Sequence, residues 1–198
     1  GLGSRFREAG YTVPKFQIEA HGKTLFEWSM ISLAGYYDED NKYFFIVRKE
    51  DDSAGFIHSM CDKLRIGNKK VIEIEALTDG QATTALLASE NWDTERPLLV
   101  YNIDTFVKPG AMHKEELHGD GFIPCFHAPG DHWSFVKLDG GGRAVEVREK
   151  QRISDNCTLG AYYFKTAALF EKIYKAFFSQ TAEMEKGEKY IAPMYNYM

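Results

Sequence analysis

The order of hydrophobic and polar positions along the chain predicts strands that alternate with helices. The expected strands are residues 43–48, 71–76 and 98–103. The expected helices are residues 24–34, 53–64 and 82–89. The third strand is almost wholly apolar, which is typical of a strand buried on both faces. This alternation predicts an α/β fold with a doubly wound, mainly parallel, Rossmann-like sheet.

The second half of the chain has a different pattern. Residues 133–138 and 144–148 flank the turn sequence at 139–142, which predicts an antiparallel hairpin. Residues 156–164 read as one more strand and residues 167–185 as an amphipathic helix. We therefore expect one domain over residues 1–198 with a late hairpin. Because a glycine loop opens the chain with no strand before it, we also expect the first strand of the domain to be missing. We expect its C-terminal end to be missing too, because Ala192–Asn196 looks like a segment that normally continues.

Composition and charge narrow the function classes. The net charge of −5 and the isoelectric point near 5.7 argue against a nucleic-acid-binding surface. No uninterrupted apolar run reaches the roughly 18 residues of a membrane helix, so no membrane span is expected. The three cysteines are far apart in the sequence, which fits a reducing compartment. We expect a cytoplasmic location.

The strongest candidate for chemistry is the glycine-rich start, Gly1–Phe6, followed by Pro14 and Lys15. Glycines let backbone N–H groups approach a polyphosphate closely. Arg5 adds a bidentate phosphate donor, and Lys15 adds a compact charge that can follow a moving phosphoryl group. The alternative is a surface turn with two solvated cations. A dinucleotide fingerprint is disfavoured, because Phe6 stands where its third glycine belongs.

Asp104 follows a predicted strand, at the end where open α/β sheets place their ligands. A carboxylate there can hold Mg²⁺, which prefers oxygen ligands and bound phosphates. The alternative is an aspartate that only turns the chain.

Two further pairs of residues are candidates for substrate contacts. Gly80 and Gln81 lie between a strand and a helix, and the glutamine amide suits the edge of a nucleobase. Glu149 and Lys150 end the hairpin strand and could meet the hydroxyls and the phosphate of a second substrate. The alternatives are a plain loop and a solvated charged pair.

Taken in this order, the motifs resemble the sugar-phosphate nucleotidyltransferase family, in particular a subgroup that serves capsule or surface-polysaccharide synthesis. The resemblance extends from Gly1 to about Asn196. The matching segments are Gly1–Phe6, Ala9–Lys15, Gly22–Trp28, Thr78–Thr84, Tyr101–Thr105, Val147–Lys150 and Leu159–Phe164.

The resemblance implies an enzyme that transfers a nucleoside monophosphate from a nucleoside triphosphate to a sugar 1-phosphate or a similar phosphorylated metabolite, releasing pyrophosphate. It implies catalytic roles for Arg5 at the triphosphate, Lys15 at the α-phosphate and Asp104 as a ligand of Mg²⁺. It implies nucleotide contacts and acceptor contacts elsewhere. The nucleotide-binding set is Leu2, Gly3, Ser4, Arg5, Gly80 and Gln81, and the acceptor-binding set is Glu149 and Lys150.

Two other functions stay open at this stage. The family's second metal-binding aspartate is not found before Met198, which would suit a nucleotide-binding or regulatory module without catalysis. A nucleotide-sugar-dependent glycosyltransferase ranks third, because Asn102-Ile-Asp104 carries only one carboxylate of the expected Asp-x-Asp metal motif.

Overall fold

The computed structural model describes residues 4–180 and 187–198, which fall into two compact units. The first unit comprises Gly1–Leu77 and Asn102–Glu116, and the second comprises Thr78–Tyr101 and Leu117–Met198. No described helix has the length and apolar character that crossing a membrane requires.

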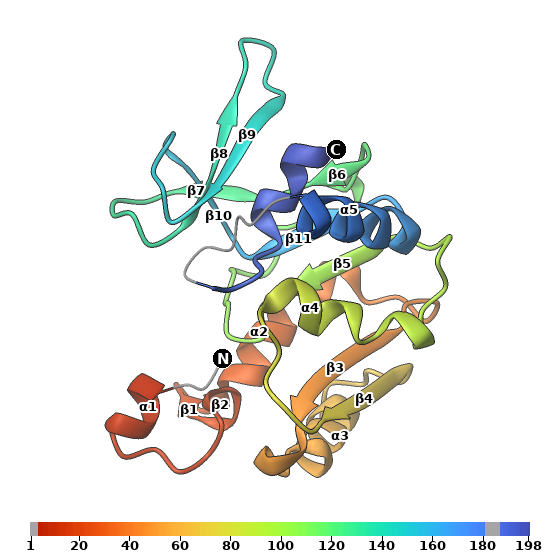
Figure 1. Cartoon of the computed structure of the whole chain (residues 1–198). Coiled ribbons are helices and arrows are strands. Elements are labelled where there is room, and N and C mark those ends of the chain that lie inside the picture. Colours follow the sequence, from red (N-terminus) through yellow and green to blue (C-terminus); the bar gives the residue numbers. More distant parts are fainter. Residues whose placement is uncertain (1–3, 181–186) are drawn as a thin grey trace. The chain divides into compact units, whose positions relative to one another are not determined.

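The first unit contains a parallel β-α-β arrangement, as the sequence predicted (Figure 1). Strand β3 (Tyr43–Arg48) leads through helix α3 (Ala54–Lys63) to strand β4 (Lys69–Ile74), which pairs with β3 in parallel. The remaining elements of this unit are α1 (Ser4–Glu8), η1 (Lys15–Gln17), β1 (Glu19–Ala20), β2 (Lys23–Thr24), α2 (Leu25–Ser32), η2 (Ala34–Tyr36), η3 (Lys49–Asp51) and η5 (Lys114–Glu116).

Helix α2 begins at a complete capping box. The Thr24 hydroxyl accepts from the Glu27 backbone N–H at 3.2 Å, and the Glu27 carboxylate accepts from the Thr24 backbone N–H at 2.9 Å. Two N–H groups at the helix start are thereby satisfied. Lys63 adds an ion pair to the other carboxylate oxygen of Glu27 at 2.7 Å, which joins the ends of α2 and α3.

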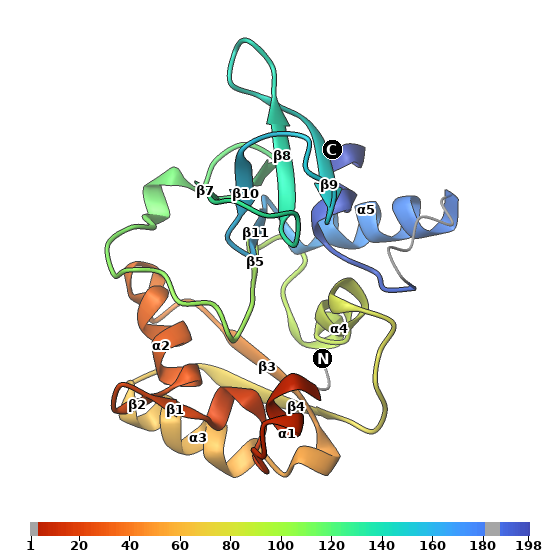
Figure 2. The same ribbon diagram turned by 90° about the vertical axis from the view of Figure 1, so that its left-hand side faces the viewer.

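The core of the first unit forms where three elements meet around Phe26, whose side chain is fully buried. Its ring lies 5.4 Å from that of Phe45 on β3 and 5.9 Å from that of Phe56 on α3. Figure 2 shows α2 and α3 beside the β3–β4 pair. Helix α2 is thus fixed on the parallel strands, and it carries the loop that follows residue 101.

The second unit holds two antiparallel sheets, with strand orders β5-β11-β6 and β7-β10-β8-β9. Its elements are α4 (Gln81–Leu86), η4 (Ser89–Asn91), β5 (Leu98–Tyr101), β6 (Gly121–Phe122), β7 (Cys125–His127), β8 (Ser134–Leu138), β9 (Ala144–Glu149), β10 (Asn156–Thr158), β11 (Ala161–Phe164), α5 (Ala167–Gln180) and η6 (Ala192–Tyr197). Strands β8 and β9 form the predicted hairpin.

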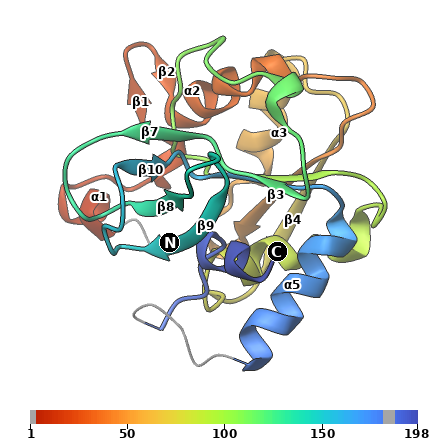
Figure 3. The same cartoon turned by 90° about the horizontal axis from the view of Figure 1, so that it is seen from above.

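Helix α5 packs beside the C-terminal turns η6, as Figure 3 shows from above. Phe170, Ile173 and Phe177 form its buried stripe, at the spacing of one helix face. They join a core shared by α4, β8, β9, β11 and η6, in which Ile191 and Met194 are fully buried. The segment from Ile191 to Met194 is therefore part of this core.

The α/β fold class is confirmed, while three details differ from the sequence pattern. Among the described strands, only β3 and β4 pair in parallel, and β5 pairs antiparallel with β11. All four β5 residues are partly exposed, because β5 is an edge strand and β11 lies between two neighbours. The single strand expected at 156–164 is split by Gly160, whose φ of +76° turns the chain between β10 and β11.

Candidate active site

The first unit brings together two predicted catalytic residues, Lys15 and Asp104. The Lys15 Nζ lies 2.5 Å from the Asp104 Oδ2, although the residues are 89 positions apart. Their side chains are 28% and 40% exposed, so both remain accessible to a ligand. Lys15 opens the short helix η1 directly after Pro14, whose ring restricts the backbone before it.

The loop that carries Asp104 is anchored on helix α2. The Ser29 hydroxyl donates to the Asn102 carbonyl at 3.2 Å, and the Val107 N–H donates to the Ser32 hydroxyl at 2.8 Å. These two serines are three residues apart and lie on the same side of the helix. The carboxylate is therefore held opposite Lys15 by a fixed scaffold, which hydrophobic periodicity alone did not predict.

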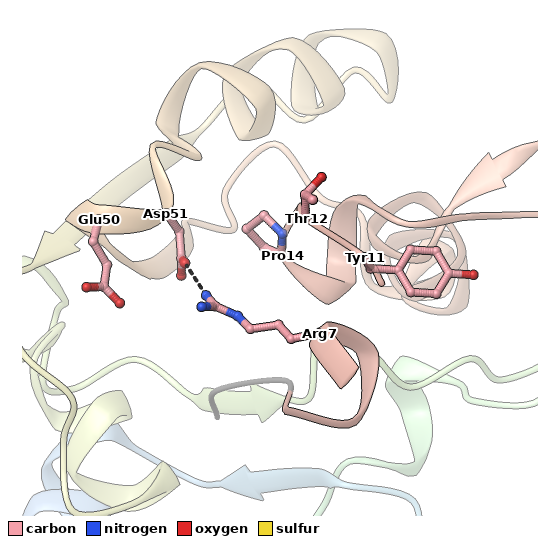
Figure 4. A pocket seen from close by; sticks show the side chains of 6 residues that line it. All are labelled: Arg7, Tyr11, Thr12, Pro14, Glu50 and Asp51. Carbon is pink, nitrogen blue, oxygen red and sulfur yellow. Dashed lines mark ion pairs between the residues drawn. The ribbon is translucent and has the colours of Figure 1, made fainter. Parts of the chain in front are cut away.

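A pocket of about 360 Å³ opens beside helix α1 in the same unit (Figure 4). It is lined by Arg7, Tyr11, Thr12, Pro14, Glu50 and Asp51. Asp51 receives a bidentate contact from Arg48, with Nε at 3.1 Å and Nη2 at 2.7 Å, and Arg7 approaches the same carboxylate at 3.7 Å. Arg7 is an accessible cation, with 61% of its side chain exposed.

Sequence reasoning did not assign a role to Arg7. Its position two residues after Arg5, directly behind the glycine-rich start Gly1–Phe6, was the available signal.

The predicted nucleobase loop, Thr78–Thr84, lies in the second unit and is closed by the chain around Lys189. Gly80 has a φ of +144°, and a Cβ atom there would lie 2.4 Å from the Lys189 backbone nitrogen. Only glycine fits this approach. The Lys189 Nζ also pairs with the Asp79 Oδ2 at 2.7 Å, so the backbone and the side chain of Lys189 both hold the loop before Gln81.

The predicted acceptor residues lie at the end of strand β9. The Glu149 side chain is 8% exposed, and its carboxylate accepts a hydrogen bond from the Ser134 hydroxyl. The Lys150 Nζ lies 3.7 Å from the Glu149 Oε1 and donates to the Tyr190 hydroxyl at 2.5 Å. Lys150 has a φ of +51°, an uncommon conformation outside glycine, and it follows directly after the last residue of β9.

The remaining predicted residues belong to the first five positions of the chain. Leu2 and Gly3 lie outside the described residues, and the same holds for the side chains of Ser4 and Arg5, whose backbone belongs to helix α1. Within residues 4–180 and 187–198, no three His, Cys, Asp or Glu side chains gather as a metal-binding group.

The comparisons with known proteins place the chain among the nucleotidyltransferases. No protein-family model matches it, and no curated protein sequence matches it. The solved structure of a nucleoside-diphosphate-sugar pyrophosphorylase from Vibrio cholerae RC9 is 38% identical, with a TM-score of 0.89 over 99% of this chain and 83% of that one.

Two more distant structures share the fold. An inositol-1-phosphate CTP transferase from T. maritima is 17% identical, with a TM-score of 0.72 over 100% of this chain and 77% of that one. A UDP-glucose pyrophosphorylase complexed with UDP-glucose is 12% identical, with a TM-score of 0.72 over 100% and 83%. The 38% identity over nearly the whole chain establishes the relationship: this chain belongs to the nucleoside-diphosphate-sugar pyrophosphorylase family of nucleotidyltransferases.

Proposed function

We propose that this chain transfers a nucleoside monophosphate from a nucleoside triphosphate to a sugar 1-phosphate or a similar phosphorylated metabolite, releasing pyrophosphate. The observation that carries the proposal is the contact between Lys15 and Asp104. The contact joins a candidate phosphate-binding cation to a candidate metal-binding carboxylate, the combination that a metal–nucleotide complex requires. Membership in the family supports the same reaction.

The phosphate end of the nucleotide would be bound by cations of the first unit. Lys15 would contact the α-phosphate, where negative charge builds up during transfer, and Arg5 would contact the triphosphate. An ammonium on a flexible stem suits this task because it can follow the phosphorus as its bonds change. Arg7, at the pocket of Figure 4, is a further accessible cation close to Arg5 in the sequence.

Asp104 fits a role as a magnesium ligand. Its carboxylate is 40% exposed and lies in an anchored loop. Protein sites for Mg²⁺ often supply one or two carboxylates and leave the other positions to water and substrate phosphates, so the lack of a larger carboxylate group among the described residues is compatible with this role. When bound, the ion would neutralise phosphate charge.

The reaction asks for positioning more than for covalent chemistry. An oxygen of the acceptor phosphate forms a bond to the α-phosphorus, and the bond from that phosphorus to the bridging oxygen of the β-phosphate breaks. Pyrophosphate leaves with the electron pair. Because the attacking phosphate is already an anion, no base has to remove a proton. In-line alignment and charge stabilisation therefore supply the rate enhancement.

Two further pairs of residues are proposed to select the substrates. Gly80 and Gln81 would contact the base, and the glutamine amide offers a donor and an acceptor. Lys150 would meet the acceptor phosphate, and Glu149 would accept from acceptor hydroxyls. By name, the T. maritima relative is an inositol-1-phosphate CTP transferase, and the V. cholerae relative is a nucleoside-diphosphate-sugar pyrophosphorylase. We propose sugar 1-phosphates first, with surface polysaccharides as the destination of the product.

The test is pyrophosphate release from a panel of nucleoside triphosphates and phosphorylated acceptors in the presence of Mg²⁺. Turnover should need both substrates, and kcat/KM should fall by about 10²–10³ in Lys15→Ala. Lys49→Ala is the matched control, because Lys49 forms an exposed ion pair with Glu75 at 2.9 Å and has no assigned role. Nucleotide binding without pyrophosphate release in any combination would instead support a non-catalytic binding module.

A further inference from the structure

Two consecutive residues, Lys189 and Tyr190, hold both substrate-binding elements of the second unit. The Lys189 N–H donates to the Asp79 carbonyl at 2.7 Å, and its own carbonyl accepts from the Ala82 N–H at 3.0 Å. These bonds lie on either side of Gly80 and Gln81. The next residue, Tyr190, contacts Lys150 at the end of strand β9.

The side chain of Lys189 fixes the nucleobase loop a second time. Its Nζ lies 2.7 Å from the Asp79 Oδ2 and 5.3 Å from the centre of the Phe178 ring, with 22% of the side chain exposed. The Asp79 carboxylate also accepts from the Thr83 hydroxyl. The loop is therefore tied through main chain and side chain to a single residue more than one hundred positions later.

The side chain of Tyr190 restrains the acceptor lysine in two ways. Its hydroxyl accepts from the Lys150 Nζ at 2.5 Å, and its ring centre lies 4.4 Å from the same atom. A lysine side chain has four rotatable bonds, so a free ammonium would lose much entropy when a phosphate binds it. A tyrosine that limits its positions reduces this loss and favours binding.

We infer that Lys189 and Tyr190 act as positioning residues for the two substrates, Lys189 for the nucleoside triphosphate and Tyr190 for the acceptor phosphate. The inference rests on the proposed function. It deepens that function by naming what holds each substrate-binding element in place. Lys189 restrains the nucleobase loop and the adjacent Tyr190 restrains the acceptor lysine, through separate contacts. A change in one residue should weaken the binding of one substrate and leave the binding of the other unchanged.

The experiment measures KM for each substrate in Lys189→Met and Tyr190→Phe. Lys189→Met should raise the KM for the nucleoside triphosphate about tenfold and leave the acceptor KM unchanged, since one charge-assisted contact is removed. Tyr190→Phe keeps the ring and should raise the acceptor KM by about tenfold alone. Lys189→Arg should keep most of the nucleotide affinity, because arginine retains the charge that pairs with Asp79. Lys175→Met and Tyr197→Phe are the matched controls, because Lys175 is exposed on α5 and Tyr197 is 40% exposed in η6.

A purely structural role would move both KM values together in each variant, and that result overturns the inference, as does no change in either. If Lys189→Met does not fold, Asp79→Asn removes the same ion pair and must show the nucleotide shift. If the wild type releases no pyrophosphate with any substrate pair, the proposed function fails. Calorimetric titration with the nucleoside triphosphates alone then decides the inference: weaker binding to Lys189→Met than to Tyr190→Phe supports it, and equal binding contradicts it.

Discussion

The ammonium of Lys15 and the carboxylate of Asp104 lie 2.5 Å apart across a sequence separation of 89 residues. Both side chains are partly exposed, and ion pairs of this kind contribute little to folding, typically about 0–1 kcal/mol. The chain nevertheless anchors the Asp104 loop through Ser29 and positions Lys15 behind Pro14. Such placement is what we expect of a pair that serves binding and catalysis, the role proposed for it above.

Lys15→Ala should therefore separate activity from stability. We expect the free energy of unfolding to change by less than about 1 kcal/mol. We expect kcat/KM to fall by about 10²–10³, the loss that follows removal of one group stabilising the transition-state charge. Urea unfolding and steady-state pyrophosphate release measure the two quantities. A variant that loses stability and activity in proportion would mean that the ion pair is structural.

Lys150→Met should weaken the binding of the acceptor and leave the binding of the nucleotide unchanged. The methionine keeps the length of the side chain and removes the charge that would meet the acceptor phosphate. We expect an acceptor KM raised by about 10–100-fold with the nucleotide KM unchanged, as for loss of a charge-assisted hydrogen bond. Lys165→Met is the control, since Lys165 forms an exposed pair with Asp120 at 3.3 Å. An equal rise in the nucleotide KM would show that Lys150 does not act specifically on the acceptor.

Gly80→Ala should disturb the nucleobase loop. The added Cβ would lie 2.4 Å from the Lys189 backbone nitrogen, and the φ of +144° is unfavourable for alanine. We expect a loss of about 1–3 kcal/mol in unfolding free energy and a raised nucleotide KM. Gly140→Ala is the matched control, because nothing lies within 4 Å of its added Cβ. Equal stability of the two variants would contradict the described loop.

Glu27→Gln should destabilise the chain in a pH-dependent way. Burial raises the pKa of Glu27, but hydrogen bonds from Lys63 and Thr24 outweigh it and leave the pKa below its usual value of 4.5. A lowered folded-state pKa gives stability that is present above about pH 4.5 and is lost as the pH falls through the folded pKa. We expect Glu27→Gln to cost about 1 kcal/mol at pH 7, the usual value of a cap, and much less near pH 3.

The measurement for Glu27 is urea unfolding of the wild type and the variant at both pH values. Glu39→Gln, at an exposed position, should show no such difference. A Glu27→Gln penalty that stays constant from pH 7 to pH 3 would argue against a charged capping box.

The three cysteines should report the integrity of both cores. Cys61 and Cys157 are fully buried, and burial raises the pKa of Cys61 to about 11. Cys125 is the exposed cysteine of the three, and partial burial of its thiol also raises its pKa to about 11. Because the thiolate is the reactive form, we expect only Cys125 to be labelled in the native chain at pH 8, and slowly. In urea we expect all three thiols to be labelled. Rapid labelling of three thiols in the native chain would mean that the cores are open.

Much of the fold could be predicted from local patterns. The apolar run at residues 43–48 and the glycine turn at 139–142 correspond to strand β3 and to the β8–β9 hairpin. The partner of β5 could not be predicted, because an apolar strand does not specify whether its neighbour runs parallel or antiparallel. Gly160 read as part of a strand, although its positive φ ends one.

The candidate site was predictable as a set of residue types and less so as a geometry. The sequence singled out Lys15 and Asp104 separately, and their contact depends on α2 holding the loop at Asn102, which only tertiary packing shows. Lys189 and Tyr190 carried no motif at all. Their contacts to Asp79 and Lys150 depend on how the C-terminal segment packs in the second unit.

The most direct test of nucleotidyl transfer follows the fate of two labelled phosphates. The chain is incubated with Mg²⁺, a sugar 1-phosphate panel and nucleoside triphosphates labelled at either the α- or the γ-phosphate. Transfer predicts the α-label in a nucleoside diphosphate sugar and the γ-label in pyrophosphate, with both products formed about 10²–10³ times more slowly in Lys15→Ala. Retention of both labels in the triphosphate, or appearance of the γ-label as free inorganic phosphate, would contradict the account.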